Sequence, residues 1–188
     1  MDIVKKIEVN KVLKVILISV LGTLLLTISA KIKIPFYSVP MTMQTFVVLF
    51  LGIALGSKIG LLTVSLYLFE GIFGLPVFAG TPEKGIGIIY FTGPTMGYLL
   101  GFLITVYIAG LFKYDNGAIN TFLKLMLSLS FIYFLGIIWL ATLIGWEKPI
   151  FKLGAQPFLL AELFKLTLLT VLLPSIIKIN NKVSKFFL

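Results

Sequence analysis

Two opposite charges, Glu162 and Lys165, lie three residues apart inside an apolar stretch near the end of the chain. Residues at this spacing share one face of a helix, so the carboxylate and the ammonium are neighbours. An ionised side chain within a membrane costs about 2.5 to 3.5 kcal/mol on insertion scales, and such residues usually mark a functional site. The pair offers a hydrogen-bond acceptor and a donor, which suits a polar ring group of a small ligand. A salt bridge that anchors the helix near the interface, with Lys165 reaching toward water, is the structural alternative.

Two longer connections on the predicted outer face could complete such a site. The first, residues 31–40, contains two prolines and leads into a polar segment with Thr42 and Gln44. The second, residues 76–93, is rich in glycine and carries a short apolar run at 88–91. Long loops in compact domains usually bind ligands or close over them. We expect both loops to lie over the substrate site.

The composition places the elements that carry these residues in a membrane. Hydrophobic residues make up 59% and charged residues 12% of the 188 residues, and the mean hydropathy is +1.11. Soluble domains carry about 25% charged residues. Because a helix needs about 20 apolar residues to cross the hydrocarbon, the pattern predicts an all-α integral membrane protein, a compact bundle of six transmembrane helices in one domain, 1–188. The predicted spans are 12–30, 41–56, 59–75, 94–112, 121–145 and 158–177.

Glycines recur at four-residue spacing in these spans. Gly52, Gly56 and Gly60 follow one another across the second and third spans, which are short and joined by a tight turn at 57–58. Small residues at this spacing let helices approach closely in lipid. Gly93 begins a similar series at the mouth of the bundle, where a ligand could contact its backbone.

All 16 basic residues are lysines, and the net charge is +9. With the N-terminus inside, ten lysines flank the cytoplasmic ends of the spans and five flank the outer ends. This bias predicts a multi-pass protein of the cell membrane with both termini in the cytoplasm. The positions of the lysines therefore argue against nucleic-acid binding. A cleavable signal peptide is a poor interpretation of the first span, because five more apolar segments follow it.

The chain contains no cysteine and no histidine. Disulfides, most zinc and haem sites and imidazole acid–base catalysis are therefore excluded, and we predict no catalytic residue, metal or cofactor. The sequence also lacks the glycine-rich, lysine-containing loop that cradles nucleotide phosphates. Energy for any transport must come from a partner or from a gradient.

Four motifs occur in order along the chain. They read VPMTMQTF at 39–46, GLPVFAG at 74–80 and GPTMGYLLGF at 93–102, followed by Pro157 and Phe158 ahead of Glu162 and Lys165. In these motifs the chain resembles the BioY family, the biotin-binding S-components of energy-coupling-factor (ECF) vitamin transporters. The resemblance covers almost the whole chain.

This resemblance implies an S-component-like bundle that captures biotin from the outer face, under loops 31–40 and 76–93. It further implies that a transmembrane coupling protein and two separate ATPases drive delivery, so the chain itself is not an enzyme. Glu162 falls where the family usually has Asp, and Lys165 matches the family's Lys, so both are expected to contact the ureido ring. The expected substrate-binding residues are Glu162, Lys165, Gln44, Thr42, Phe78, Gly80, Tyr90, Gly93 and Tyr98.

The chain also departs from the family pattern. The first helix carries only Ser19, Gly22 and Thr23 where S-components often have alanines that dock the coupling protein. No Arg is present to bind the ligand carboxylate, which leaves Lys84 or backbone N–H groups near Gly80.

Two other functions are compatible with the sequence. An S-component for another vitamin would share the architecture. A gradient-driven transporter would use Glu162 or Glu70 as its proton-coupling carboxylate. An enzyme embedded in the membrane is poorly supported, since only Glu, Lys and hydroxyl groups remain for chemistry.

Overall fold

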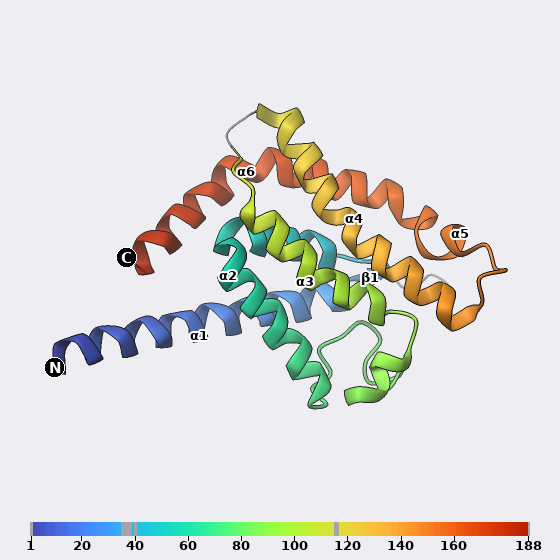
Figure 1. Cartoon of the computed structure of the whole chain (residues 1–188), viewed down its shortest axis with the longest axis horizontal. Coiled ribbons are helices and arrows are strands. Elements are labelled where there is room, and N and C mark those ends of the chain that lie inside the picture. Colours follow the sequence, from blue (N-terminus) through green and yellow to red (C-terminus); the bar gives the residue numbers. More distant parts are fainter. Residues whose placement is uncertain (1, 35–38, 40, 115–116, 188) are drawn as a thin grey trace.

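The computed structural model describes residues 2–34, 39, 41–114 and 117–187 (Figure 1). Apart from one short pair of strands, the regular structure of these residues is helical, as predicted. The elements in chain order are α1 (Asp2–Lys31), β1 (Lys33–Ile34), β2 (Met41–Thr42), α2 (Gln44–Ile72), the 3-10 helix η1 (Gly87–Thr92), α3 (Met96–Leu111), α4 (Gly117–Ile144), α5 (Ile150–Gly154), the 3-10 helix η2 (Gln156–Phe158) and α6 (Leu159–Phe187).

Four helices in the described part of the chain are long and apolar enough to cross a membrane. They cover residues 11–31, 44–72, 117–144 and 150–183. The apolar helix α3 has 16 residues and is shorter than this limit. Both chain ends lie at the same end of the molecule (Figure 1). The protein is therefore a helical membrane protein with several apolar spans.

Helix α2 joins the two short spans that the sequence predicted separately. The break between its halves is at Gly56 (φ 76°, ψ 173°), not at residues 57–58, which belong to the second half. Residues with a Cβ atom are essentially excluded from this backbone conformation. A Cβ on Gly60 would lie 3.4 Å from the carbonyl oxygen of Leu51, so the two halves fold back on each other. The predicted pair of spans is thus a helical hairpin that turns at a glycine.

Small residues pack the helices together, as their spacing predicts. A Cβ on Gly52 would lie 2.6 Å from the carbonyl oxygen of Val106 in α3. On the other side of α3, a Cβ on Gly97 would lie 2.4 Å from the carbonyl oxygen of Leu135 in α4, and Gly101 is equally close to Ile132. The backbones of α2, α3 and α4 therefore touch directly.

Helix α1 is the most exposed of the four long helices. Of an 18-residue apolar stretch in each helix, 28% is buried in α1 and 56% in α2. Its small residues Ser19 and Thr23 are 1% and 2% exposed, and a Cβ on Gly22 would lie 2.4 Å from the Thr63 methyl group. Thr23 also donates a hydrogen bond to Glu70 (2.9 Å). These three residues of α1 are thus buried against α2, and the place where a coupling protein docks stays a prediction.

The described parts of the two predicted outer loops lie at the end of the molecule opposite to the chain ends (Figure 1). The antiparallel pair β1–β2, which was not predicted, pairs Lys33 with Thr42 and Ile34 with Met41. Residues 35–38 and 40 of the first loop lie outside the described residues. In the second loop, turns precede η1, which contains the predicted apolar run 88–91. Short helices α5 and η2 lead from α4 into α6 and were not predicted either.

Candidate functional site

The charged pair near the start of α6 is buried inside the protein. The Lys165 ammonium lies 2.8 Å from a carboxylate oxygen of Glu162, and each residue is 4% exposed. In a soluble or membrane interior, such a pair is tolerated only when hydrogen bonds satisfy its remaining donors and acceptors. The pair therefore does not face lipid, which argues against the interfacial anchor considered from the sequence.

Side chains from two other helices and one backbone carbonyl complete the hydrogen bonds of this pair. The Thr45 hydroxyl, at the start of α2, lies 3.0 and 2.9 Å from Oε1 and Oε2 of Glu162. The Tyr133 hydroxyl from α4 donates to Oε1 at 3.1 Å. Lys165 donates to the Thr42 carbonyl (2.7 Å) and to the Thr45 hydroxyl (3.0 Å) as well as to Glu162. Among the described residues, no buried side-chain nitrogen or oxygen lacks a partner.

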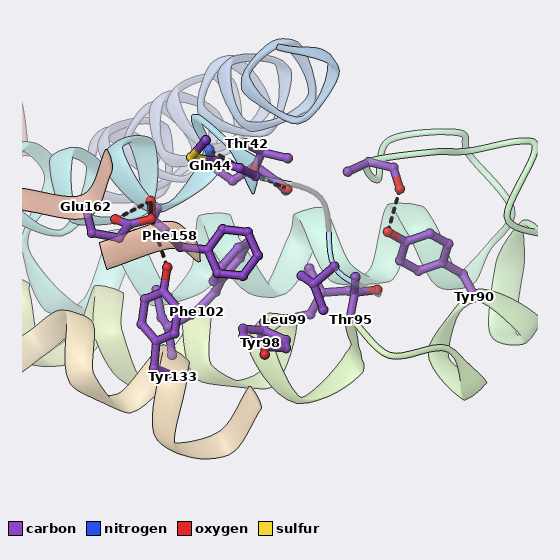
Figure 2. A pocket seen from close by; sticks show the side chains of 15 residues that line it. Thr42, Gln44, Tyr90, Thr95, Tyr98, Leu99, Phe102, Tyr133, Phe158 and Glu162 are labelled. Atoms are coloured by element: carbon purple, nitrogen blue, oxygen red, sulfur yellow. Dashed lines mark hydrogen bonds between the residues drawn. The ribbon is translucent and has the colours of Figure 1, made fainter. Parts of the chain in front are cut away.

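Glu162 lies at one end of a cavity in which the centre of a water-sized molecule can occupy about 60 Å³. In Figure 2, Glu162 and Tyr133 lie at one end of this cavity and Tyr90 at the other. Aliphatic and aromatic side chains form most of the wall between them. The lining residues are Val39, Met41, Thr42, Gln44, Thr45, Ala79, Tyr90, Thr95, Tyr98, Leu99, Phe102, Ile132, Tyr133, Phe158 and Glu162.

Two tyrosine hydroxyl groups fasten loops to this cavity. Tyr98 in α3 donates to the Gly154 carbonyl of α5 (2.8 Å), which fixes the turn that leads into α6. Tyr90 in η1 donates to the Ala79 carbonyl (2.7 Å), and both residues line the cavity. Burial raises the pKa of the Tyr90 hydroxyl, so the group stays protonated and keeps donating at neutral pH.

Five residues proposed from the sequence line the cavity together: Thr42, Gln44, Tyr90, Tyr98 and Glu162. They come from β2, α2, η1, α3 and α6, so the fold brings distant parts of the chain together. Gln44 is 4% exposed, and its amide donates to the buried Tyr67 hydroxyl (2.8 Å).

The other four proposed residues do not line the cavity. Lys165 contacts Glu162 and Thr45, which line the cavity, but is not itself a lining residue. Phe78 is 1% exposed and stacks on Tyr90 with a centroid distance of 4.8 Å, so it supports the cavity wall from behind. Gly80 has φ +80° and packs under the Lys84 side chain, and the Gly93 carbonyl accepts a hydrogen bond from Trp139 (2.9 Å).

Sequence reasoning missed several residues that the cavity brings together. Thr45 stands next to Gln44 within a quoted motif, so its position was a usable signal. Tyr133 lies in an apolar span, 29 residues before Glu162, and nothing in the sequence relates the two. Phe102 and Ile132 line the cavity from α3 and α4, whose backbones come close together at Gly101 and Ile132.

The site has neither the ligands of a metal centre nor a catalytic constellation. The described residues contain no group of three or more Asp, Glu, His or Cys side chains that could hold a metal ion. The arrangement instead suits a small molecule with a polar end and an apolar body, because one end of the cavity carries the charged pair and the walls are apolar.

Comparison with known proteins decides the family. The model of the BioY family matches residues 4–182 of the 188. The chain belongs to the BioY family. A probable biotin transporter BioY of Pyrococcus horikoshii is 38% identical over 141 residues, which cover 75% of this chain and 82% of that protein. The biotin transporter BioY2 of Lactococcus lactis is 30% identical over 171 residues, 89% of this chain and 92% of that protein.

A solved structure has the fold of this BioY family chain. It is the crystal structure of the S-component for biotin from an ECF-type ABC transporter, with a TM-score of 0.75 and 24% sequence identity. The similarity covers 95% of this chain and 98% of that one. The S-component fold expected from the sequence motifs is therefore confirmed.

Proposed function

We propose that this BioY family chain is the substrate-capture subunit for biotin uptake. The observation that carries the proposal is the buried Glu162–Lys165 pair, whose carboxylate lines one end of an otherwise apolar cavity. Biotin has matching chemistry: a ureido ring with two N–H donors and one carbonyl, attached to an apolar bicycle and a valeryl chain. The relatives named as biotin transporters support the same ligand.

The two carboxylate oxygens of Glu162 differ in their remaining capacity. Oε1 accepts hydrogen bonds from Thr45, Tyr133 and Lys165, whereas among the described residues Oε2 contacts only Thr45. An ionised carboxylate offers about four acceptor positions in total, two on each oxygen. We therefore assign Oε2 as the acceptor for a ureido N–H group of the ligand.

Lys165 has a different role in this proposal from the one expected from the family. An ammonium group has three N–H donors. All three are directed at protein oxygens, those of Thr42, Thr45 and Glu162. We propose that Lys165 orients Glu162 and that the ureido carbonyl accepts from the Gln44 amide, which has two N–H groups and donates one of them to Tyr67.

The apolar body of biotin would fill the rest of the cavity. Leu99, Phe102 and Ile132 are at most 4% exposed, and Phe158 is 3% exposed. Burial of apolar surface contributes about 25 cal/mol per Å². These walls therefore supply most of the binding free energy, and the charged end fixes the orientation of the ring.

We propose that the cavity faces the outside of the cell and that delivery requires separate subunits. The chain ends lie together, opposite to the loops that carry Ala79 and Tyr90 (Figure 1). The lysine distribution favours the cytoplasm for both ends. A coupling protein and two ATPases would supply the energy, since the chain carries no nucleotide-binding loop.

A binding measurement on the purified protein tests this proposal. We expect saturable binding of labelled biotin that unlabelled biotin competes away. The Glu162→Gln variant should lose at least a hundredfold in affinity, because it removes the acceptor charge and leaves Lys165 buried without its counter-ion. Glu162→Asp, which restores the residue usual in the family, should retain binding. Glu147→Gln and Lys152→Met, two exposed positions, serve as matched controls.

The outcomes separate the ligand from the site. Absence of saturable binding in the unmodified protein would contradict the proposed function. Normal binding by a well-folded Glu162→Gln variant would leave biotin as the ligand but refute the assigned site. Tighter binding of another vitamin than of biotin would favour the alternative S-component function.

A further inference from the structure

The cavity-lining Ala79 belongs to residues 77–81, a loop segment whose carbonyl groups accept hydrogen bonds from side chains of three separate elements. Tyr67 of α2 donates to the Val77 carbonyl (3.0 Å), and Tyr90 of η1 donates to the Ala79 carbonyl (2.7 Å). Lys31, the last residue of α1, donates to the carbonyls of Phe78 (3.0 Å) and Thr81 (3.1 Å). Ala79, in the middle of this segment, lines the cavity.

The two tyrosine anchors are buried and fixed. Tyr67 is 0% exposed, and its hydroxyl accepts a hydrogen bond from the cavity-lining Gln44 while it donates to Val77. Tyr90 is 4% exposed and stacks on Phe78. A buried hydrogen bond of this kind breaks only at the cost of leaving an unpaired polar group. These anchors therefore act as a permanent hinge.

Lys31 differs from the tyrosines because its side chain is exposed and water can replace its partners. Its ammonium also contacts the Thr81 hydroxyl (3.1 Å), and that hydroxyl donates to the Phe78 carbonyl (2.7 Å). One lysine thus gathers three oxygens of the segment, and hydrogen bonds to a charged donor are stronger than neutral ones. This anchor is both the most connected and the most easily released.

The element that carries Lys31 is the peripheral helix α1. The helix packs mainly against α2, and its other face exposes apolar side chains such as Leu17, Leu21 and Ile28. A displacement of α1 relative to α2 would therefore pull directly on residues 78–81. Among the described residues, the long helix α2 also reaches this segment, through the Tyr67 hydroxyl, but that side chain is fully buried.

We propose that Lys31 is a positioning residue that latches residues 77–81 over the ligand cavity and thereby sets how long the ligand stays bound. The inference rests on the proposed function for the identity of the ligand. Lys31 does not line the cavity, so its loss should leave the ligand contacts intact and should raise the rate at which the segment opens. The position of α1 then controls release.

Hydrogen exchange tests the latch without any ligand. We expect the Lys31→Met variant to exchange the amides of residues 77–85 about fivefold faster than the unmodified protein, since the turn amides of Thr81 and Lys84 bond to carbonyls within this segment. Exchange in α3 and α4 should not change. Lys33→Met removes the same charge from a nearby exposed position and should have no effect. Unchanged exchange in a folded Lys31→Met variant would overturn the latch.

Binding kinetics test the consequence for the ligand. We expect Lys31→Met to raise the biotin dissociation rate about fivefold and to leave the association rate within a factor of two. Lys31→Arg, which keeps a charged donor, should restore slow dissociation, and Thr81→Val should give a smaller increase. If the unmodified protein binds no biotin, the proposed function fails and the exchange result still stands. If biotin binds and its dissociation rate is the same in Lys31→Met, the inference fails alone.

Discussion

At the scale of single residues, this protein buries an ion pair in a membrane domain and satisfies every atom of it. Several kcal/mol of desolvation oppose the burial of each charge. Thr45 offsets part of this cost because its hydroxyl contacts the carboxylate and also accepts from the ammonium. The result leaves one oxygen of Glu162 with spare capacity beside the cavity. The arrangement makes the carboxylate a fixed acceptor.

Replacing Thr45 by Val should therefore destabilise the protein. Val has a similar shape but no hydroxyl, so the Glu162 carboxylate and the Lys165 ammonium each lose a buried partner. We expect the free energy of unfolding to fall by about 1 to 3 kcal/mol, measured by thermal unfolding in detergent. Thr170→Val is the control, because the Thr170 hydroxyl bonds only to the Leu166 carbonyl of its own helix. Equal melting temperatures for the two variants would contradict the role given to Thr45.

Replacing Tyr133 by Phe should weaken ligand binding, because the Glu162 carboxylate loses one of the hydroxyl groups that hold it in place. The ring and its edge-on contact with Tyr98 (6.1 Å between centroids) are kept, and only the hydroxyl next to Glu162 is lost. We expect a loss in biotin affinity of about tenfold, typical of one hydrogen bond to a charged group, measured by equilibrium binding. Tyr114→Phe removes a hydroxyl that bonds to Ala109 outside the ligand cavity, and it should bind biotin normally.

At the scale of the elements, the hairpin of α2 positions the site. Its first half begins at Gln44 and places Thr45 against α6, and its second half carries Tyr67 to the loop over the cavity. The chain reverses at Gly56, and close contacts at Gly60 and Gly110 hold the reversed halves against each other and against α3. One glycine conformation therefore fixes the distance between two functional regions.

The variant Gly56→Ala should be destabilised by about 1 to 3 kcal/mol. The added methyl group would meet no atom within 4 Å, so the cost comes from the positive φ alone. Thermal unfolding in detergent measures the effect. Ser57→Ala, one residue later and within the helix, is the matched control and should melt like the unmodified protein. A Gly56→Ala variant of undiminished stability would show that the turn can relax to another conformation.

At the scale of the whole molecule, the two ends of the structure differ in what they carry. One end carries the loop that contains the cavity-lining residues Ala79 and Tyr90, and the other end carries both termini (Figure 1). Exposed apolar side chains cover α1, α4 and α6, as a lipid environment requires. Capture from one side of the membrane and coupling on the other follow naturally from this arrangement under the proposed function.

The absence of cysteine makes the orientation directly testable. A single Cys in place of the exposed Lys84, on the second loop, should react with a membrane-impermeant maleimide added to intact cells. A single Cys in place of Lys58 should react only after the cells are opened, because it lies beside the Gly56 turn in the middle of α2, away from the two ends of this hairpin. Labelling of Lys58→Cys in intact cells, with or without labelling of Lys84→Cys, would contradict the predicted topology.

The sequence by itself determined the membrane environment, the helical class, the tight packing at glycines and the charged pair. Each of these depends on local composition or on spacing within one helix, and such features need no knowledge of distant contacts. The sequence motifs also sufficed for the family. Lys165, three residues from Glu162, had to share its face whatever the rest of the chain did.

Only the tertiary structure decided which residues surround that pair and which residues line the cavity. The contact between Tyr133 and Glu162 depends on how α4 packs beside α6, and the bond between Lys31 and Thr81 depends on where α1 ends relative to a loop 50 residues away. The same packing buried Ser19 and Thr23 of α1 and placed Phe78 behind the wall of the cavity. Side-chain partners across elements are set by helix crossings, and these follow from the close packing of the entire bundle.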